Sequence, residues 1–97
     1  MPVSVKNIEL NTVIYRDNSQ PYSEIDGEVV MLNVKKEAYF ALNKVGSKIW
    51  SEISEPCVIS NLIDKIQQEY SVSVETCFKD IKPFIEELVK ANIIKVK

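Results

Sequence analysis

The stretch EAYFALNKVGSKIW, residues 37–50, changes from the pattern of a strand to the pattern of a helix. Its first part, Glu37–Leu42, is rich in aromatic and apolar side chains, which favours a β-strand. Asn43 is a good helix N-cap, because its side chain can accept a hydrogen bond from an otherwise unpaired backbone N–H. Apolar residues then recur at helical spacing, at Val45, Ile49, Trp50 and Ile53. The stretch therefore predicts a strand that runs directly into a helix.

Two more strands are predicted before this stretch. Leu10–Tyr15 contains consecutive β-branched and aromatic residues, and EVVMLNV, residues 28–34, is a compact apolar run. The turn signal Asp26-Gly27 precedes the second of them. Only the charged pair Lys35-Lys36 separates that strand from Glu37–Leu42, and so short a gap predicts a hairpin, although its turn lacks glycine.

Two further helices are predicted after residue 55. Apolar residues at helical spacing mark one over residues 58–70 and a longer one over 74–91. Pro83 lies inside the last helix and removes a backbone donor, so we expect a kink near it. Residues 93–96 are predicted to add a short extended segment. The order predicts an α+β domain, a three-stranded antiparallel sheet followed by three helices in a winged-helix-like arrangement.

Length and composition predict one small globular domain over residues 1–97, with residues 1–9 as a loosely ordered arm. The net charge is −2, and lysines alternate with acids, so nothing suggests the basic face of a nucleic-acid-binding protein. No apolar run reaches the roughly 18 residues of a membrane span. The first residues lack the apolar core of a signal peptide. We therefore expect a cytoplasmic protein with no nucleic-acid or membrane partner.

The residue types that carry catalysis are scarce. The chain has no histidine, which removes the commonest general base and metal ligand. Cys57 and Cys77 are not paired in sequence, and the only glycines, Gly27 and Gly46, form no phosphate-binding loop. The adjacent acids Glu86-Glu87 point in different directions on a helix. We therefore expect no enzyme, no metal and no cofactor.

Several short motifs occur in an order that is similar to the PqqD-like family. They are Tyr39-Phe40-Ala41-Leu42-Asn43, Gly46, Ile49-Trp50, the break at Pro56, Asp80-Ile81, Phe84, Leu88 and Ala91-Asn92-Ile93-Ile94. The likeness covers residues 25–96. Each motif by itself forms core, and it is their order that carries the resemblance.

The resemblance implies a recognition element for ribosomally made, post-translationally modified peptides. In such an element the precursor's leader peptide adds as a strand to the third strand and packs against the third helix. Its partner is a separate processing enzyme: a radical SAM enzyme in pyrroloquinoline quinone assembly, or the cysteine protease that removes the leader in lasso-peptide assembly. The length of the chain matches a free-standing element, and we favour the lasso-peptide system.

The candidate peptide-binding residues lie on the third strand and the third helix. They are Glu37, Ala38, Tyr39, Phe40, Ala41 and Leu42, with Cys77, Asp80, Ile81 and Phe84. If the sheet order follows the chain, the strand is an edge that can accept another strand. Phe40 and Leu42 would face the core and Tyr39 and Ala41 the other side. Asp80 either pairs with a basic leader residue or is simply solvated.

The third helix also predicts its own core. We expect Phe78, Ile81, Ile85 and Leu88 to form the centre of its apolar face, with Cys77, Asp80 and Phe84 on the flank as the wall of a groove.

Two other functions compete with peptide binding. A winged-helix DNA-binding regulator would read DNA with the third helix, but acids outnumber lysines there, which opposes contact with phosphates. The other competing function is that of a structural or regulatory domain, which binds a protein partner and no peptide substrate.

Overall fold

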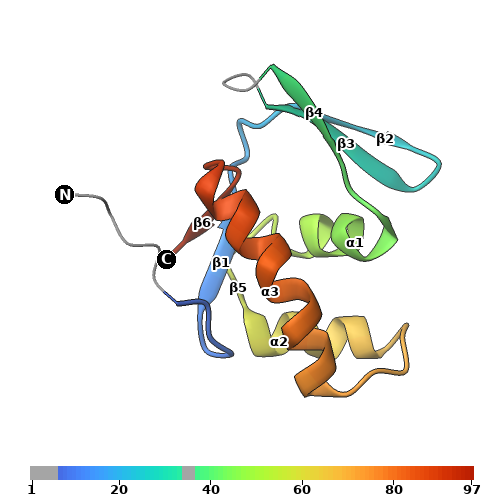
Figure 1. Cartoon of the computed structure of the whole chain (residues 1–97), viewed down its shortest axis with the longest axis vertical. Helices are drawn as coiled ribbons and strands as arrows, with labels where there is room; N and C mark the ends of the chain where they lie inside the picture. The colour runs from blue at the N-terminus through green and yellow to red at the C-terminus, as the bar shows by residue number, and fades with distance from the viewer. Residues whose placement is uncertain (1–6, 34–36) are drawn as a thin grey trace.

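The computed structural model describes residues 7–33 and 37–97 of the chain. Its strands are β1 (Val13–Arg16), β2 (Tyr22–Ile25), β3 (Glu28–Asn33), β4 (Ala38–Ala41), β5 (Cys57–Val58) and β6 (Ile94–Val96), and its helices are α1 (Lys44–Glu52), α2 (Ile59–Gln67) and α3 (Val74–Lys90). The predicted α+β class is confirmed, with two small antiparallel sheets. Figure 1 shows the sheet of β2, β3 and β4 at one end of the molecule and α2 at the other, with α1 between them.

The sheet at that end has the order β2-β3-β4, so β4 lies at an edge, as the sequence predicted. Asp26 and Gly27 join β2 to β3 with φ angles of 54° and 80°. Two residues with positive φ form the turn that matches the twist of a tight hairpin. The predicted strand end at Val34 and the break at Lys35-Lys36 lie outside the described residues.

One predicted strand is confirmed, but its predicted place in the sheet was wrong. The strand predicted over Leu10–Tyr15 corresponds to β1, but β1 pairs with β5 and β6 in a separate sheet and not with the hairpin. The hairpin sheet instead takes β2 as its third strand. All four residues of β2 are exposed, so Tyr22–Ile25 carries no apolar alternation by which to detect it. The extended segment predicted near the C-terminus is confirmed as β6.

The three helices begin and end close to the predicted positions. Asn43 is the N-cap of α1, and its side chain accepts from the backbone N–H of Gly46 over 2.8 Å. Helix α2 starts at Ile59, because Val58 is still paired with Val13 in the sheet. Helix α3 is assigned as one helix through Pro83, and the kink expected there stays a prediction. Among the described residues, no helix is long and apolar enough to cross a membrane.

A single cluster of buried apolar side chains joins the helices to both sheets. Trp50 is 2% exposed, which confirms its predicted place in the core. Ile8, assigned from sequence to a loosely ordered arm, is 1% exposed and belongs to the cluster, whereas residues 1–6 lie outside the described part. On α3 the prediction for Phe78 was wrong. Phe78 is only partly buried, and Cys77 takes its place in the buried stripe.

An aromatic and cationic contact joins the two sheets. The guanidinium of Arg16 in β1 lies 5.3 Å from the ring centroid of Tyr22 in β2 and 5.1 Å from that of Trp50 in α1. The two rings meet edge to face at 5.6 Å. Arg16 Nη1 also donates to the carbonyl of Trp50 over 3.0 Å. Such contacts are attractive at this range, so they hold the hairpin sheet against the helices.

Candidate functional site

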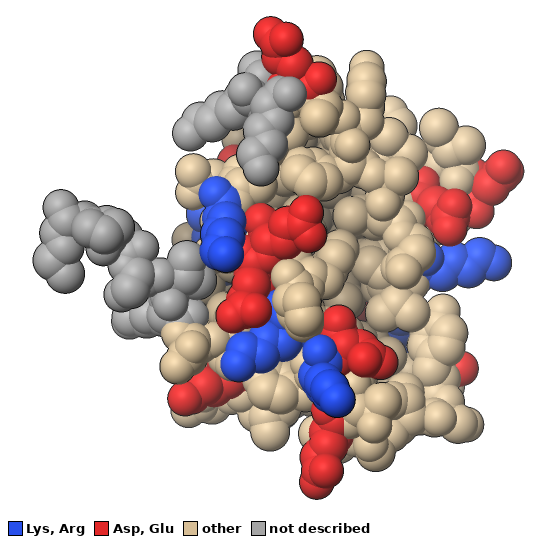
Figure 2. Space-filling model, in the orientation of Figure 1, with Lys and Arg blue, Asp and Glu red and all other residues tan. Residues whose placement is uncertain are grey.

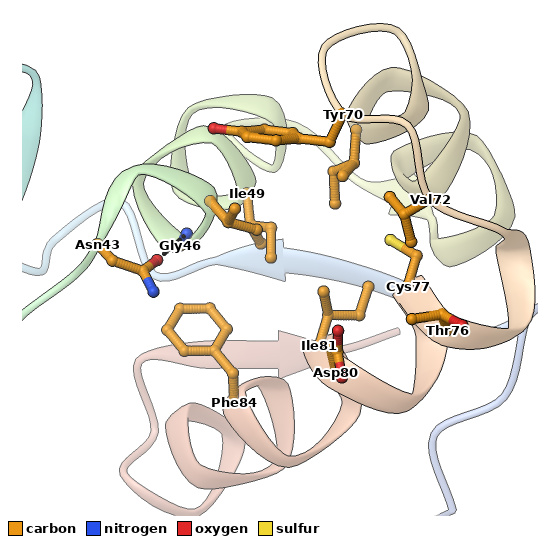
Figure 3. Close-up of a pocket in the computed structure, with 12 residues that line it drawn as sticks. Asn43, Gly46, Ile49, Tyr70, Val72, Thr76, Cys77, Asp80, Ile81 and Phe84 are labelled. Atoms are coloured by element: carbon orange, nitrogen blue, oxygen red, sulfur yellow. Dashed lines mark hydrogen bonds between the residues drawn. The ribbon is translucent and has the colours of Figure 1, made fainter.

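A pocket of about 440 Å³ lies between α1 and α3. Figure 3 shows Gly46, Ile49 and Tyr70 on one side of it, facing Phe84, Ile81 and Cys77 on the other. Its lining is Asn43, Val45, Gly46, Ile49, Ile66, Tyr70, Val72, Thr76, Cys77, Asp80, Ile81 and Phe84. Most of these side chains are apolar, so the pocket suits an apolar group with few polar contacts.

All four candidate residues of α3 line this pocket. Asp80 and Ile81 lie three and four positions after Cys77, and Phe84 lies four and three positions after them, which places all four along one side of a helix. Cys77 and Ile81 are buried, Phe84 is partly buried and Asp80 is exposed. The pocket therefore has an apolar floor with one carboxylate at its rim.

The thiol of Cys77 belongs to the apolar wall. Burial, and then the negative charge of Asp80, raise the pKa of Cys77 above the usual range for a thiol. Burial likewise raises the pKa of Cys57. The thiolate is the reactive form of cysteine, so neither environment activates the sulfur as a nucleophile.

Within the part of the chain that the structure describes, the edge of β4 away from β3 has no partner strand. The backbone N–H of Leu42 donates to the carbonyl of Val29 in β3 over 2.8 Å. Backbone groups of an antiparallel strand point alternately to either side, so Phe40 also faces β3. The N–H and C=O groups of Tyr39 and Ala41 therefore point to the open edge. These are the groups with which an added strand would pair.

The side chains of β4 alternate as the sequence predicted. Phe40 is partly buried and packs against the core, and Leu42 just beyond the strand is 5% exposed. Tyr39 is 75% exposed and Ala41 is also exposed. Ala38 and Glu37 are exposed as well, and Glu37 precedes the strand with a φ of 49°.

The strand and the pocket adjoin each other along the chain. None of the six candidate residues from Glu37 to Leu42 lines the pocket, but Asn43, the next residue, does. Leu42 lies close to Gly46, which lines the pocket: a Cβ built on that glycine would fall 3.3 Å from the Leu42 Cβ. The first residue that lines the pocket therefore follows β4 by a single intervening residue, Leu42.

Sequence reasoning missed the other side of the pocket. Val45, Gly46 and Ile49 of α1 line it, and so do Tyr70 and Val72 between α2 and α3. The sequence predicts Val45 and Ile49 as part of the apolar stripe of α1, and that spacing gives no sign that they also line a pocket. Gly46 is the residue of this wall that carries a signal in the sequence. Glycine inside a helix lowers the helix's stability, so its presence indicates a close contact or another special requirement at that position.

The face of the molecule on which α3 lies in Figure 1 bears charges of both signs. Figure 2 shows Lys and Arg side chains interleaved with Asp and Glu over one face, without a large basic region on that face. Among the described residues, no cluster of three or more histidine, cysteine or acidic side chains is suited to hold a metal ion.

One family of known proteins matches the chain. The family described as "Coenzyme PQQ synthesis protein D (PqqD)" matches residues 28–94, which include β3, β4, the three helices and every residue that lines the pocket. No curated protein and no solved structure gives a significant match.

Proposed function

The chain belongs to the PqqD family, and from this premise we propose that it binds the leader peptide of a precursor by strand addition to β4. The family consists of non-catalytic recognition proteins that bind precursor peptides and work with modifying enzymes. The observation that carries the proposal is the continuity between an open strand edge and an apolar pocket. In this proposal β4 holds the leader's backbone, and α3 contacts its side chains.

The two features have different energetic roles. Tyr39 and Ala41 offer two N–H and two C=O groups, and each bond is worth about 0.5–1.5 kcal/mol net. Such bonds roughly offset the cost of ordering a flexible peptide. The surplus must come from apolar anchors in the pocket, at about 1.5–3 kcal/mol each. A few anchors would reach the roughly −8 kcal/mol of a micromolar complex.

We assign the carboxylate of Asp80 to charge selection at the pocket rim. It is exposed and lies beside the apolar floor formed by Cys77 and Ile81. A basic leader residue next to an apolar anchor would place its charge near this carboxylate. An exposed pair of this kind contributes little affinity and acts mainly by steering at low salt.

The proposed partner is the separate cysteine protease that removes the leader in a lasso-peptide system, and this protein would deliver the precursor to it in the cytoplasm. The second candidate is a radical SAM enzyme, for which the protein would act as a peptide chaperone. The family's description, which names coenzyme PQQ synthesis, favours that alternative. The neighbouring genes distinguish the two: a short precursor gene beside a protease and a cyclase supports the first, and a radical enzyme supports the second.

Binding of the encoded leader tests the proposal. A fluorescent leader peptide from the neighbouring precursor gene should bind with micromolar or better affinity, and a scrambled peptide of the same composition should not. Random duplex DNA at low salt is the second control. A shift of the duplex with no binding of the leader would reject the peptide-binding function in favour of a DNA-binding one.

A further inference from the structure

Gly46 faces the ring of Phe84 with no side chain between them. A Cβ built on Gly46 would fall 3.1 Å from Cζ and 3.2 Å from Cε1 of Phe84. Real Cβ atoms rarely come so close to a neighbour. Gly46 lies inside α1 with helical backbone angles, so its conformation does not require glycine. The Phe84 ring on one side, together with the Leu42 Cβ at 3.3 Å, supplies the reason for glycine at this position.

The Phe84 ring lies at one end of the pocket. In Figure 3 it lies beside Asn43 and Gly46, while Val72 and Cys77 lie at the opposite end. Asn43 follows directly on the strand segment that would hold a peptide, so the ring stands where the peptide would enter the pocket. Phe84 is partly buried and has no polar group, so packing alone sets the position of its ring.

We infer that Gly46 is a positioning residue for peptide recognition: its missing side chain seats the Phe84 ring at the entrance of the pocket. This inference rests on the proposed function. The seated ring gives the pocket a fixed entrance before a peptide arrives, and preordered contacts reduce the entropy lost on binding. A methyl group at position 46 requires the ring to shift by a few tenths of an ångström, and this shift changes the shape of the entrance that a peptide side chain meets.

A double-mutant cycle tests this inference, with Gly46→Ala, Phe84→Ala and the double variant. The probes are peptides selected from a random displayed library on the parent protein and counter-selected against an unrelated protein. Gly46→Ala should weaken their binding by roughly threefold or more, because the added methyl group shifts the ring at the entrance, and residues in contact couple their effects. In the Phe84→Ala background the same change should have a smaller effect, because only the close approach to the Leu42 Cβ remains. Ser51→Ala, on the exposed side of α1, is the matched control and should leave binding unchanged.

Thermal melting gives a second readout that needs no peptide. Alanine is a better helix former than glycine. Gly46→Ala should therefore change the melting temperature more favourably in the Phe84→Ala background, where the ring is gone, than in the parent, where the ring stands 3.1 Å from the new Cβ.

The outcomes separate this inference from the proposed function. If peptides bind the parent but Gly46→Ala weakens them equally in both backgrounds, the inference is overturned and peptide binding stands. If Gly46→Ala shifts the melting temperature equally in both backgrounds, the seating contact itself is refuted. If the library yields no binder of the parent, the proposed function and the inference fail together, whatever the melting curves show about the contact.

Discussion

The hydroxyl of Ser47 in α1 donates to the backbone carbonyl of Leu42 over 3.2 Å. The same oxygen accepts the backbone N–H of Val29 in β3 over 2.8 Å. The N–H of Leu42 donates to the carbonyl of Val29, as in a regular antiparallel pair. The return bond of such a pair, from the N–H of Val29 to the carbonyl of Leu42, is replaced by the Ser47 hydroxyl, which bonds to both groups. Ser47 is buried and thus joins the ends of two strands to the helix. This contact fixes the edge of β4 relative to the pocket.

Ser47→Ala should destabilise the protein by about 1–3 kcal/mol, because it leaves a buried donor and a buried acceptor without their partner. Ser51→Ala is the control, since the Ser51 hydroxyl is exposed and donates only to the carbonyl of Lys48 in its own helix. Urea denaturation measures the difference in the free energy of unfolding between the two variants. Equal midpoints for the two variants would show that the Ser47 bridge contributes nothing.

Ala41→Pro should weaken peptide binding while β4 stays paired with β3. The N–H that proline removes points to the open edge, and proline is tolerated at such positions of edge strands. We expect a loss of about 0.5–1.5 kcal/mol from the missing bond, plus any distortion of the edge. Ala41→Ser keeps the N–H and should bind like the parent. Isothermal titration of all three proteins measures the effect, and unchanged affinity of the proline variant would exclude pairing at Ala41.

Trp50→Ala should cost about 3–5 kcal/mol of stability, because it empties a large volume of the core. Trp50→Phe should cost much less. The indole Nε1 is buried with no hydrogen-bond partner among the described residues, and phenylalanine removes that unpaired donor. Thermal melts compare the variants. If Trp50→Ala melts within a few degrees of the parent, the core assignment of this residue is wrong.

Asp80→Asn should weaken peptide binding mainly at low salt. The carboxylate is exposed at the pocket rim, and salt screens an exposed charge beyond about 10 Å at 0.1 M ionic strength. Glu87→Gln removes a charge from an exposed position of the same helix that does not line the pocket. Affinities measured across a salt series should diverge only for Asp80→Asn. Parallel curves for both variants would show a general charge effect and no steering by Asp80.

The sequence predicted most of the elements because each carries a local signal. Asn43 marks the start of α1, and the stripe that contains Trp50 fixes its buried side. The partner of β1 could not be found this way, because β1 and β6 lie about 80 residues apart and pairing over such a distance leaves no local pattern. Strand β2, Tyr22–Ile25, was missed for a local reason, because a strand with no buried residue shows no alternation of apolar and polar side chains.

The candidate site was half predicted. The spacing of Cys77, Asp80 and Phe84 placed them on one flank of a helix, and the structure brings them together at the pocket. The opposing wall on α1 was out of reach, because a residue such as Ile49 has the same apolar spacing whether it faces core or pocket. Only packing between the two helices distinguishes these roles, and the contact between Gly46 and Phe84 is an example.

The most direct test of strand addition is an NMR titration of the protein with its leader peptide, followed amide by amide. The largest shifts should fall on Tyr39 and Ala41, whose N–H groups point to the open edge, and along the flank from Cys77 to Phe84. Phe40 and Leu42, whose N–H groups point toward β3, should shift less. Shifts confined to other surfaces, with residues 37–42 and 77–84 unchanged at saturation, would contradict the proposed binding mode.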